Sequence, residues 1–591
     1  MSAKTTPKGL KEVTYNDAVA RSKEYFGGDE LAATVWVSKY ALKDSFGHIY
    51  ESSPEDMHHR IAAEIERIEK NYPNPLSRDE IFALLDHFRY VIPQGGPMTG
   101  IGNNLQIASL SNCFVIGHKK PADSYGGIIR MDEEQVQIMK RRGGVGHDLS
   151  HLRPTGSPVL NSALTSTGIV PFMERYSNST REVAQDGRRG ALMLTISIKH
   201  PDAERFIDAK VDTSKVTGAN VSVKIDDEFM RAAIAGKPYH QQFPIDAEKP
   251  MYEQDIDARA LWKKIIHNAW KSAEPGVLFW DTILRESVPD CYADEGFNTV
   301  STNPCGEIPL CPYDSCRLLA LNLYSYVDKP FTAEASFDFA KFRDHVGKAM
   351  RMMDDIIDLE LEKVEQIIAK IDADPEEADI RYVESNLWKK VREMALKGRR
   401  TGLGITAEGD MIAALGMRYG SDEAVAFAVE VHKTLALAAY GASVEMAEER
   451  GAFPLYDAAR ELDNPMIARI READPALYER MVKSGRRNIA MLTIAPTGTT
   501  SLMSQTTSGI EPVFRPVYKR RRKINPSDHN VKVAFVDDTG ERFEEFYVFH
   551  HNFVEWARVN GHDTSTLATI SDAELEKLVA ASPYHKATAN D

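Results

Sequence analysis

Residues 301–310 read STNPCGEIPL, a stretch that combines a tight turn with three side chains able to act in catalysis. A proline and a glycine flank Cys305, which predicts a non-helical loop with the thiol at its tip. Asn303 and Glu307 lie two residues before and after the cysteine, so an extended backbone turns all three side chains to one face. The stretch therefore predicts a cluster of a thiol, an amide and a carboxylate.

The chemistry of this cluster favours a thiol that stays protonated. The nearby negative charge of Glu307 disfavours a thiolate at Cys305, which speaks against ionic cysteine catalysis. The arrangement fits Glu307 as a general acid–base and Asn303 as a hydrogen-bond donor to a substrate. An ordinary loop with a chance cysteine and glutamate is the alternative.

The whole chain is large and acidic, because its 591 residues carry 72 Lys and Arg against 87 Asp and Glu, a formal net charge of −15. Phosphate neutralisation needs clustered cations, so this balance argues against a general nucleic-acid binder. The basic run at residues 519–523 is predicted to be a solvated segment. No apolar run approaches the ~18 residues of a membrane span, and the N-terminus lacks a signal-peptide core. We expect a cytoplasmic protein.

The cysteines are few and unevenly placed, at positions 113, 291, 305, 311 and 316. Their odd number argues against a disulfide scaffold, and neither CxxC nor a Cys/His zinc spacing occurs, so no metal site is predicted. They could simply be small buried hydrophobes. Cys113 lies in an apparent strand, and thiols on neighbouring strands reach the ~4.4–6.8 Å Cα separation of a disulfide. Whether Cys113 and Cys316 meet is left open.

Three regions are predicted along the chain. Residues 1–75 form an N-terminal helical region, with a helix at 57–70. Residues 76–520 form one α/β domain, because short apolar segments alternate with helical ones and predict a parallel sheet. Residues 521–591 form an extension with a hairpin (531–535 and 543–549, joined by 537–540) and a helix at 572–581. Strands are expected within residues 106–117, 142–154, 187–198 and 487–494. The clearest other helices are expected at residues 261–272, 342–364 and 424–451.

Two glycine-containing turns could approach a ligand. Residues 496–501 (PTGTTS) follow the last expected strand and offer hydroxyls and free backbone N–H groups, so they could form an anion nest. An ordinary capping turn is equally compatible with this segment. The glycines of residues 143–146 (GGVG) could let the backbone approach a ligand closely.

Together these segments resemble the catalytic subunit of ribonucleotide reductases, over nearly the whole chain from about residue 30. The motifs that carry the resemblance are SNCFV, RRGGVGHDLSHLRPTGSPV, QDGRRGALM, STNPCGEIPL, RRTGLGI and TIAPTGTTS, in the family's order. The resemblance implies a ten-stranded α/β barrel of two five-stranded halves, with STNPCGE as a finger loop through its centre. It implies reduction of ribonucleotides, expected to be diphosphates, to 2′-deoxyribonucleotides for DNA precursor synthesis.

The resemblance also implies the catalytic roles. Cys305 would carry a transient thiyl radical that abstracts the 3′-hydrogen of the ribose. Glu307 would accept the 3′-OH proton, and Asn303 would hydrogen-bond the ribose. Cys113 and Cys316 would deliver two electrons and end as a disulfide, whereas the other two cysteines remain structural. The implied substrate-binding residues are Asn112, Cys113, Gly144, Asn303, Cys305, Glu307, Pro496, Thr497, Gly498, Thr499 and Thr500.

Nucleotide effectors (dNTP or ATP) are implied at the interface of a homodimer. Residues 153–166 and 185–192 would form the two specificity loops. No N-terminal ATP cone is recognisable, so we expect specificity regulation without an overall activity site. The implied effector-binding residues are Asp123, Ser124, Arg153, Gln185, Arg188 and Arg189.

The radical source is expected to be adenosylcob(III)alamin. Residues 34–40 (TVWVSKY) and the NPCGE motif look most like the cobalamin-dependent class II enzymes, and the chain has no Tyr-Tyr pair of the oxygen-dependent class I. The anaerobic class would need a glycyl-radical loop and a Cys-rich zinc site. A class I large subunit with a dimetal radical partner, or a non-catalytic nucleotide-binding regulator, remain the alternatives.

Two departures from the class II pattern lead to further expectations. Class II chains normally continue past the equivalent of Lys586 into another barrel strand and a tail with CxxC, so we expect either a truncated chain or a second polypeptide that supplies both. A thioredoxin-type protein would be the reductant. Gly95 and Gly96 replace a Ser or Thr that many members use near the phosphate, which leaves that contact to the backbone.

Overall fold

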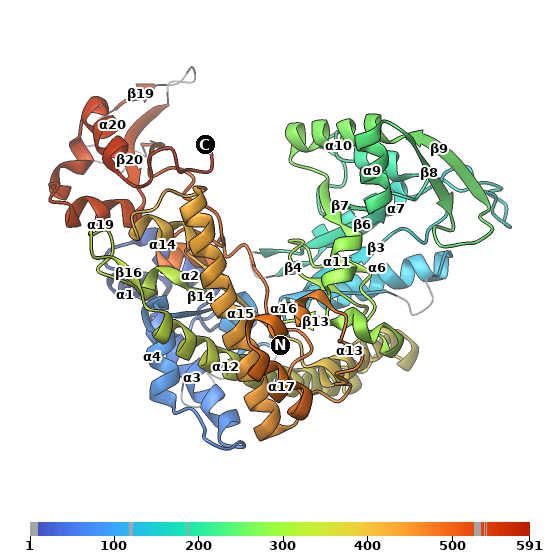
Figure 1. Ribbon diagram of the computed structural model, residues 1–591, viewed down its shortest axis with the longest axis horizontal. Helices are drawn as coiled ribbons and strands as arrows, with labels where there is room; N and C mark the ends of the chain where they lie inside the picture. The colour runs from blue at the N-terminus through green and yellow to red at the C-terminus, as the bar shows by residue number, and fades with distance from the viewer. Residues whose placement is uncertain (1–9, 118–121, 186–187, 525–532, 537, 539–540) are drawn as a thin grey trace.

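The computed structural model describes residues 10–117, 122–185, 188–524, 533–536, 538 and 541–591, without the side chains of 184, 185, 188, 189 and 522. The chain forms two arms that rise from a shared helical base (Figure 1). Among the described residues, no helix is both long and apolar enough to cross a membrane.

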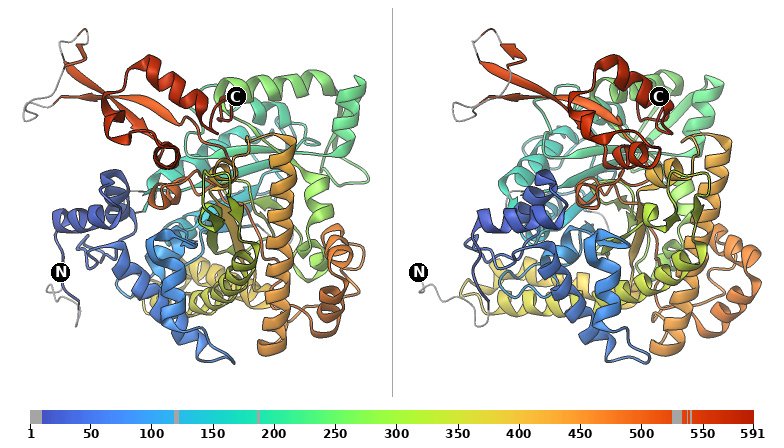
Figure 2. Two further views of the ribbon diagram at one scale, coloured as in Figure 1. Left: turned by 60° about the vertical axis from the view of Figure 1, so that its left-hand side comes forward. Right: turned by 90° about the vertical axis from the view of Figure 1, so that its left-hand side faces the viewer.

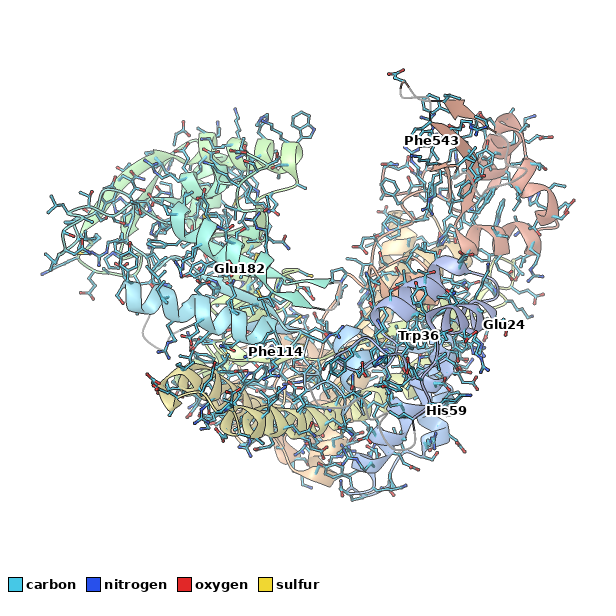
Figure 3. The ribbon with its side chains drawn as sticks, turned by 180° about the vertical axis from the view of Figure 1, so that it is seen from behind. Glu24, Trp36, His59, Phe114, Glu182 and Phe543 are labelled. Atoms are coloured by element: carbon cyan, nitrogen blue, oxygen red, sulfur yellow. The ribbon has the colours of Figure 1, made fainter. Side chains whose placement is uncertain are left out.

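The N-terminal helical region contains α1 (Tyr15–Tyr25), α2 (Glu30–Lys39), α3 (Pro54–Glu69) and α4 (Arg78–Leu85). The helix predicted at 57–70 is confirmed as α3, whose isoleucines at helical spacing are buried. Trp36 of α2 is fully buried and donates from Nε1 to Met57 Sδ of α3 at 3.4 Å, which joins these two helices (Figure 3).

A six-stranded sheet forms one arm, in the order β10-β7-β6-β3-β2-β13. The first five of these strands are parallel, whereas β13 pairs antiparallel with β2. Helices such as α6 (Tyr125–Met139) and α7 (Val170–Glu182) alternate with the strands, as the sequence predicts. The strands are β2 (Cys113–Val115), β3 (Gly144–Asp148), β6 (Leu192–Ser197), β7 (Asn220–Ile225), β10 (Gly276–Phe279) and β13 (Ser315–Cys316).

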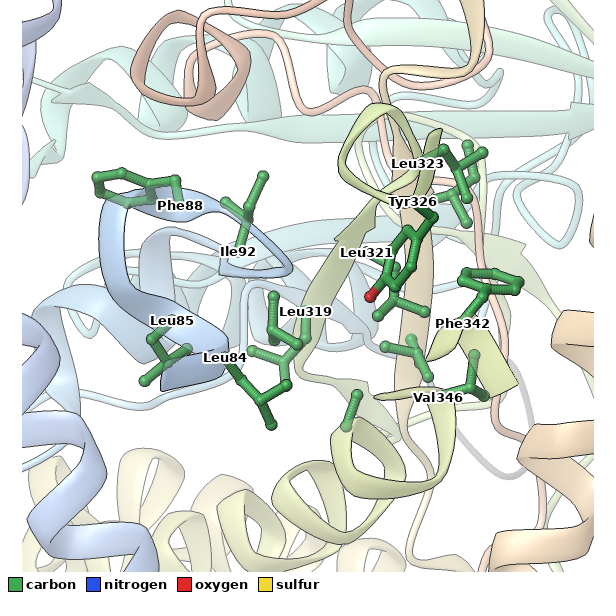
Figure 4. Packing of buried hydrophobic residues seen from close by; sticks show 14 of the residues in the cluster. Leu84, Leu85, Phe88, Ile92, Leu319, Leu321, Leu323, Tyr326, Phe342 and Val346 are labelled. Carbon is green, nitrogen blue, oxygen red and sulfur yellow. The ribbon is translucent and has the colours of Figure 1, made fainter. Parts of the chain in front are cut away.

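A second, three-stranded sheet contains β1 (Val91–Pro93), β14 (Leu318–Asn322) and β17 (Gly402–Thr406). Strand β14 pairs parallel with β17 and antiparallel with β1. Leu319 and Leu321 of β14 are buried in the largest core, between side chains of α4 and of the long helix α12 (Phe339–Asp372) (Figure 4). The sheet is thereby fixed to the helical base.

The prediction of a strand at residues 487–494 is wrong, because the segment does not form a regular strand. It contributes one isolated bridge, between Leu403 and Leu492. The segment follows β17 through the hydrogen bonds of Leu403 N to Met491 O at 2.8 Å and of Thr493 N to Leu403 O at 3.0 Å. This short run of pairing does not make a regular strand.

The two sheets meet at residues 315–322. The first two of these residues form β13, which pairs with β2, and the last five form β14, which pairs with β17. The five parallel strands have the number expected for one barrel half. A closed barrel is not seen, because the described strands of the two sheets are not hydrogen-bonded into one ring.

Several further helices agree with the sequence predictions. Helix α12 extends the predicted helix at 342–364 in both directions, and the other three are found within a few residues of their predicted bounds. Figures 1 and 2 show α15 as a long orange helix. These three are α10 (Ala258–Ser272), α15 (Asp422–Arg450) and α20 (Asp572–Ala581).

The remaining elements connect these parts. The helices among them are α5 (Gly95–Gly100), α8 (Ala203–Asp208), α9 (Asp227–Ala235), α11 (Trp280–Glu286), α13 (Ala378–Gly398), α14 (Glu408–Ala414), α16 (Pro465–Ala473), α17 (Pro475–Ser484), α18 (Thr500–Ser504) and α19 (His551–Val559). The strands are β4 (Ala184–Gln185), β5 (Arg188–Arg189), β8 (Pro238–Phe243), β9 (Tyr252–Asp257), β11 (Ser301–Thr302), β12 (Pro309–Leu310), β15 (Val327–Asp328) and β16 (Ser336–Phe337).

The basic run at residues 519–523 is solvated as the sequence predicts, because Lys519, Arg520, Arg521 and Lys523 are exposed, and it forms part of a strand, β18 (Val517–Lys523). It pairs with β20 (Arg542–Phe549), whose glutamates face it, as in the Arg521–Glu545 ion pair at 2.6 Å. A third strand, β19 (Phe535–Val536), pairs with the other edge of β20. Parts of the predicted hairpin, at residues 531, 532, 537, 539 and 540, lie outside the described residues.

Candidate active site

The STNPCGEIPL stretch forms a narrow hairpin loop. Strand β11 pairs antiparallel with β12, and the turn between them carries Cys305 at an exposed position, as the sequence predicts. Gly306 has a φ of +88°, a left-handed conformation that favours glycine. Asn303 N donates to Ile308 O at 3.2 Å, which narrows the loop at its base. The thiol is therefore held at the tip of a rigid loop.

Glycines of β3 allow this loop to lie close to the parallel sheet. A Cβ atom on Gly146 would lie 1.8 Å from Thr302 O, and one on Gly144 would lie 2.9 Å from Pro304 Cγ. The GGVG segment therefore accommodates the backbone and proline of the loop, and Gly144 also lines the pocket described below. The sequence predicted a close approach at these glycines but not that the loop would be the partner.

Replacing Gly146 by alanine is expected to push the catalytic loop away from β3. Overpacking of this kind costs about 1–3 kcal/mol in the free energy of unfolding. Gly347→Ala is the matched control, because a Cβ there meets nothing within 4 Å and alanine favours its helix. Denaturant unfolding should show a lower midpoint for Gly146→Ala alone. An unchanged midpoint for Gly146→Ala would contradict the tight approach.

Asn303 organises the polar groups of the loop. Its Nδ2 donates to Glu307 Oε2 at 2.7 Å and to Cys113 Sγ at 3.2 Å, while its Oδ1 accepts from Ile308 N at 3.0 Å. Burial raises the pKa of Glu307, and the hydrogen bond from Asn303 partly lowers it again. The carboxylate is thus positioned beside a thiol, with its pKa above the ordinary range.

Cys113 and Cys316 are directly opposite each other, although 316 − 113 = 203 residues separate them. They are register partners in the antiparallel β2–β13 pair, so their side chains share one face. No disulfide joins them, and both are buried. Burial, and then Glu307, raise the pKa of Cys113 well above its usual range, whereas burial raises the pKa of Cys316 to about 12 against the effect of Arg400 and Arg317. The pair is placed for a disulfide.

One pocket of about 350 Å³ is lined by Cys113 and by the three loop side chains, Asn303, Cys305 and Glu307. Three larger cavities, of about 950, 1030 and 700 Å³, lie elsewhere in the described structure and contain none of the three loop side chains. Cys316 is not among the described residues that line the small pocket, but its partner Cys113 is. The predicted residues that line it are Asn112, Cys113, Gly144, Asn303, Cys305, Glu307, Pro496, Thr497, Gly498, Thr499 and Thr500.

Comparison with known protein families identifies the source of this arrangement. Residues 111–542 match the family described as "Ribonucleotide reductase, barrel domain". The chain belongs to the ribonucleotide reductase family.

Similar members of the family come from distant organisms. The chain is 32% identical over 495 residues to the "Vitamin B12-dependent ribonucleoside-diphosphate reductase" of Mycobacterium tuberculosis (strain CDC 1551 / Oshkosh), covering 83% of this chain and 62% of that protein. It is 32% identical over 445 residues to the protein of the same name from Thermoplasma acidophilum, covering 75% and 50%. It is 25% identical over 451 residues to the "Ribonucleoside-diphosphate reductase large chain" of Neurospora crassa, covering 70% and 45%. The chain therefore spans less than two thirds of the length of these relatives.

The pocket of this member of the ribonucleotide reductase family is also lined by residues outside the predicted substrate-binding set, among them Gly95 and Gly96, which the sequence analysis expected near the phosphate. Lys39 and Tyr40, at the end of α2, reach it from the N-terminal helical region, and Arg142 lines it from the loop before β3. Lys39 and Arg142 bring positive charge to a pocket whose turn at 496–500 has none. A lysine or arginine near the end of a surface helix gives no sequence signal of its own, because such positions are commonly solvated. The others are Gln94, Gly95, Gly96, Ala191, Leu318 and Ala495.

The turn at residues 496–500 is held from behind. Thr497 has a φ of +49°, and its hydroxyl contacts Thr406 Oγ1 at 2.9 Å and accepts from Gly509 N at 2.8 Å. The hydroxyl of Thr500 donates to Gln94 Oε1 at 3.1 Å. Gly498 is exposed, and a Cβ there would meet nothing within 4 Å. The turn therefore presents an open, backbone-lined side to the pocket.

The predicted effector residues are brought together only in part. Arg153 Nε donates to Asp123 Oδ2 at 2.7 Å, and Ser124 caps α6 by accepting from Gly127 N at 3.2 Å. Strands β4 and β5, which carry Gln185, Arg188 and Arg189, pair with each other. The side chains of these three residues lie outside the described part of the structure.

The two remaining cysteines lie outside the pocket lining. Cys311 is fully buried with its Sγ 3.7 Å from Asp314 Oδ2, and Cys291 is half-buried. Among the residues that the structure describes, no group of three His, Cys, Asp or Glu side chains could hold a metal ion.

Proposed function

We propose that this chain is the catalytic part of an adenosylcobalamin-dependent ribonucleoside-diphosphate reductase. The observation that carries the proposal is the convergence of Cys305, Asn303, Glu307 and the Cys113–Cys316 pair at one pocket. The names of the mycobacterial and Thermoplasma relatives, both B12-dependent diphosphate reductases, support the cofactor and the substrate class.

The side chains divide the reaction between them. A thiyl radical at Cys305 takes the 3′-hydrogen of the ribose, while Glu307 accepts the 3′-OH proton. Water then leaves C2′, and Cys113 and Cys316 together supply two electrons and two hydrogens as their disulfide forms. Cys305 returns the 3′-hydrogen at the end. In balance, one ribonucleotide and two thiols give one deoxyribonucleotide, one water and one disulfide.

The geometry fits a large cofactor outside the pocket. A volume of about 350 Å³ is in the range of a drug-sized ligand such as a nucleotide, but too small to enclose a cobalamin as well. Cys305 is exposed, so its thiol can be reached from the open side of the loop. Adenosylcobalamin, when bound, supplies the initial radical by homolysis of its cobalt–carbon bond. Cys305 is the residue that would receive the radical.

The finer architecture belongs to the same proposal. We take the five parallel strands and the β1-β14-β17 sheet as parts of the two halves of a ten-stranded barrel, with the loop at residues 301–310 between them. Substrate phosphates would lie on the turn at 496–500, and nucleotide effectors near Asp123, Ser124 and Arg153 of a homodimer. We also propose that the chain divides into three regions, at residues 1–75, 76–520 and 521–591.

An assay with purified chain tests the function. Incubation with CDP or ADP, an effector nucleotide, adenosylcobalamin and dithiothreitol should yield the matching deoxynucleotide, measured by chromatography. Absence of product from folded protein would overturn the proposal. Activity that ignores cobalamin and needs a dimetal radical protein would instead favour the class I large subunit. Nucleotide binding without any product would indicate a regulator.

Replacing Asn303 by alanine is expected to shift the pH profile. Glu307 must be ionised to accept a proton, so kcat/KM falls as the pH drops through its pKa, which burial already raises. The substitution removes the hydrogen bond that lowers this pKa, so the acid limb should move to higher pH. Asn298→Ala, an exposed asparagine outside this pocket, is the control and should keep the original limb. Identical limbs for both variants would contradict the role of Asn303.

A further inference from the structure

We propose that the Cys113–Cys316 disulfide is reopened in one fixed order: a dithiol reductant attacks Cys113 Sγ, and Cys316 leaves as the thiolate. This inference rests on the proposed function, which forms the disulfide once in every turnover. The structure makes the two cysteines unequal in access and in the charge around them.

Access favours Cys113. It lines the pocket, and its Sγ lies 3.2 Å from the amide of Asn303. Cys316 is 1% exposed and lies on the edge strand β13, where its Sγ faces β17. A Cβ on Gly402 would lie 2.4 Å from that sulfur, so β17 covers it closely. A thiol that enters through the pocket therefore meets Cys113 first.

Charge favours Cys316 as the leaving group. Arg317 is fully buried and Arg400 is 6% exposed, and both guanidinium groups act on Cys316. Asp314 binds Arg400 Nε at 2.6 Å, and Glu360 lies near Arg317. Even so, Arg317 Nε and Arg400 Nη2 have no hydrogen-bond partner among the described residues. Buried donors without a partner are costly, and a thiolate nearby would compensate them.

The surroundings of Cys113 have the opposite sign. After burial, the carboxylate of Glu307 is the strongest influence that raises the pKa of Cys113. At Cys316, by contrast, Arg400 and Arg317 oppose the effect of burial and lower the pKa. A disulfide opens faster when the departing thiol has the lower pKa, so the electrostatics agree with the access.

The exchange balances without any further reactant. A thiolate of the reductant bonds to Cys113 Sγ while the S–S bond breaks, and the electron pair goes to Cys316 Sγ, which then takes a proton. The second thiol of the reductant attacks the mixed disulfide and releases Cys113, which is protonated in turn. The products are two cysteine thiols and the oxidised dithiol. Because the attack comes through the pocket, a bound nucleotide should block it.

Trapping the mixed disulfide tests the order directly. The full chain with Cys305→Ser is oxidised with diamide, pulsed with glutathione, quenched with N-ethylmaleimide and analysed by peptide mass spectrometry. We expect glutathione on Cys113 and maleimide on Cys316, in at least tenfold excess over the reverse labelling. Equal labelling, or glutathione mainly on Cys316, overturns the order. If diamide forms no Cys113–Cys316 disulfide, the pairing itself fails, and the proposed function fails with it.

Two substitutions should change the rate of glutathione attack in opposite directions. Arg400→Met removes a charge beside Cys316 and should slow the attack by about threefold for each pKa unit that the leaving thiol gains, at a Brønsted slope of about 0.4–0.5. Arg400→Lys keeps the charge and should restore most of the rate. Glu307→Gln removes the anion beside Cys113 and should speed the attack, even if Arg400→Met fails to fold. Equal rates of attack in Glu307→Gln and the parent chain would overturn the role proposed for the charges around the two cysteines.

Protection by nucleotides tests the proposed substrate site separately from the proposed order of attack. CDP or ADP added before the pulse should slow the labelling of Cys113, because the nucleotide and the incoming thiol would share the pocket of about 350 Å³. If nucleotides do not slow the labelling of Cys113, the proposed substrate site is wrong. The order of attack is judged separately, from the ratio of glutathione on Cys113 to glutathione on Cys316.

Discussion

Cys305→Ser is expected to abolish deoxynucleotide formation while leaving the fold unchanged. An O–H bond is stronger than an S–H bond, so a serine at the loop tip cannot carry the radical that takes the 3′-hydrogen. Cys305 is exposed, and surface substitutions usually change stability by within about 0.5 kcal/mol. The assay with CDP or ADP should therefore give product only at the background rate, from protein with an unaltered melting temperature.

Cys291→Ser is the matched control for this loss. Cys291 is half-buried and lies outside the pocket, so its replacement should leave turnover near the wild-type rate. Turnover by the Cys305→Ser protein above background would show that another group carries the radical, and the role given to the loop tip would be wrong.

Glu307→Gln is expected to lower kcat by about 10²- to 10⁴-fold, the usual contribution of a positioned general base. The glutamine is nearly isosteric and its carbonyl oxygen can still accept from Asn303, so the loop should keep its shape. The loss would therefore report proton transfer rather than collapse of the pocket. Steady-state kinetics should show the fall in kcat with a smaller change in KM.

The control for Glu307→Gln is Glu295→Gln, at an exposed glutamate a few residues before the loop. Its kcat should match that of the wild type. A Glu307→Gln enzyme that keeps more than about a tenth of the wild-type kcat would contradict a general-base role, since such roles contribute at least about 10²-fold.

Local sequence patterns predicted the parts of the site that depend on neighbouring residues. The proline and glycine around Cys305 were sufficient for the exposed loop, and helical periodicity was sufficient for α3 and α20. The strand expected at 487–494 was wrong because an apolar run does not reveal whether a neighbouring strand continues beside it.

Features that depend on how distant parts of the chain pack together could not be derived from the sequence. The register that places Cys113 opposite Cys316 follows from the order of strands in the sheet. The family resemblance, rather than spacing, supplied that pair. Lys39 and Tyr40 were missed as pocket residues because their place there depends on how the N-terminal helices pack against the rest of the molecule.

The scattered origin of the pocket has a consequence for biosynthesis. Its walls come from residues 39–40, 94–96, 112–113, 303–307 and 495–500, so the pocket cannot form before about residue 500 has left the ribosome. At roughly 5–20 residues per second, the 203 residues between Cys113 and Cys316 take about 10–40 s to synthesise. During that interval Cys291, Cys305 and Cys311 emerge before Cys316 does. Premature pairing of Cys113 with one of them is the misfolding hazard of this chain, and a reducing surrounding during translation is what prevents it.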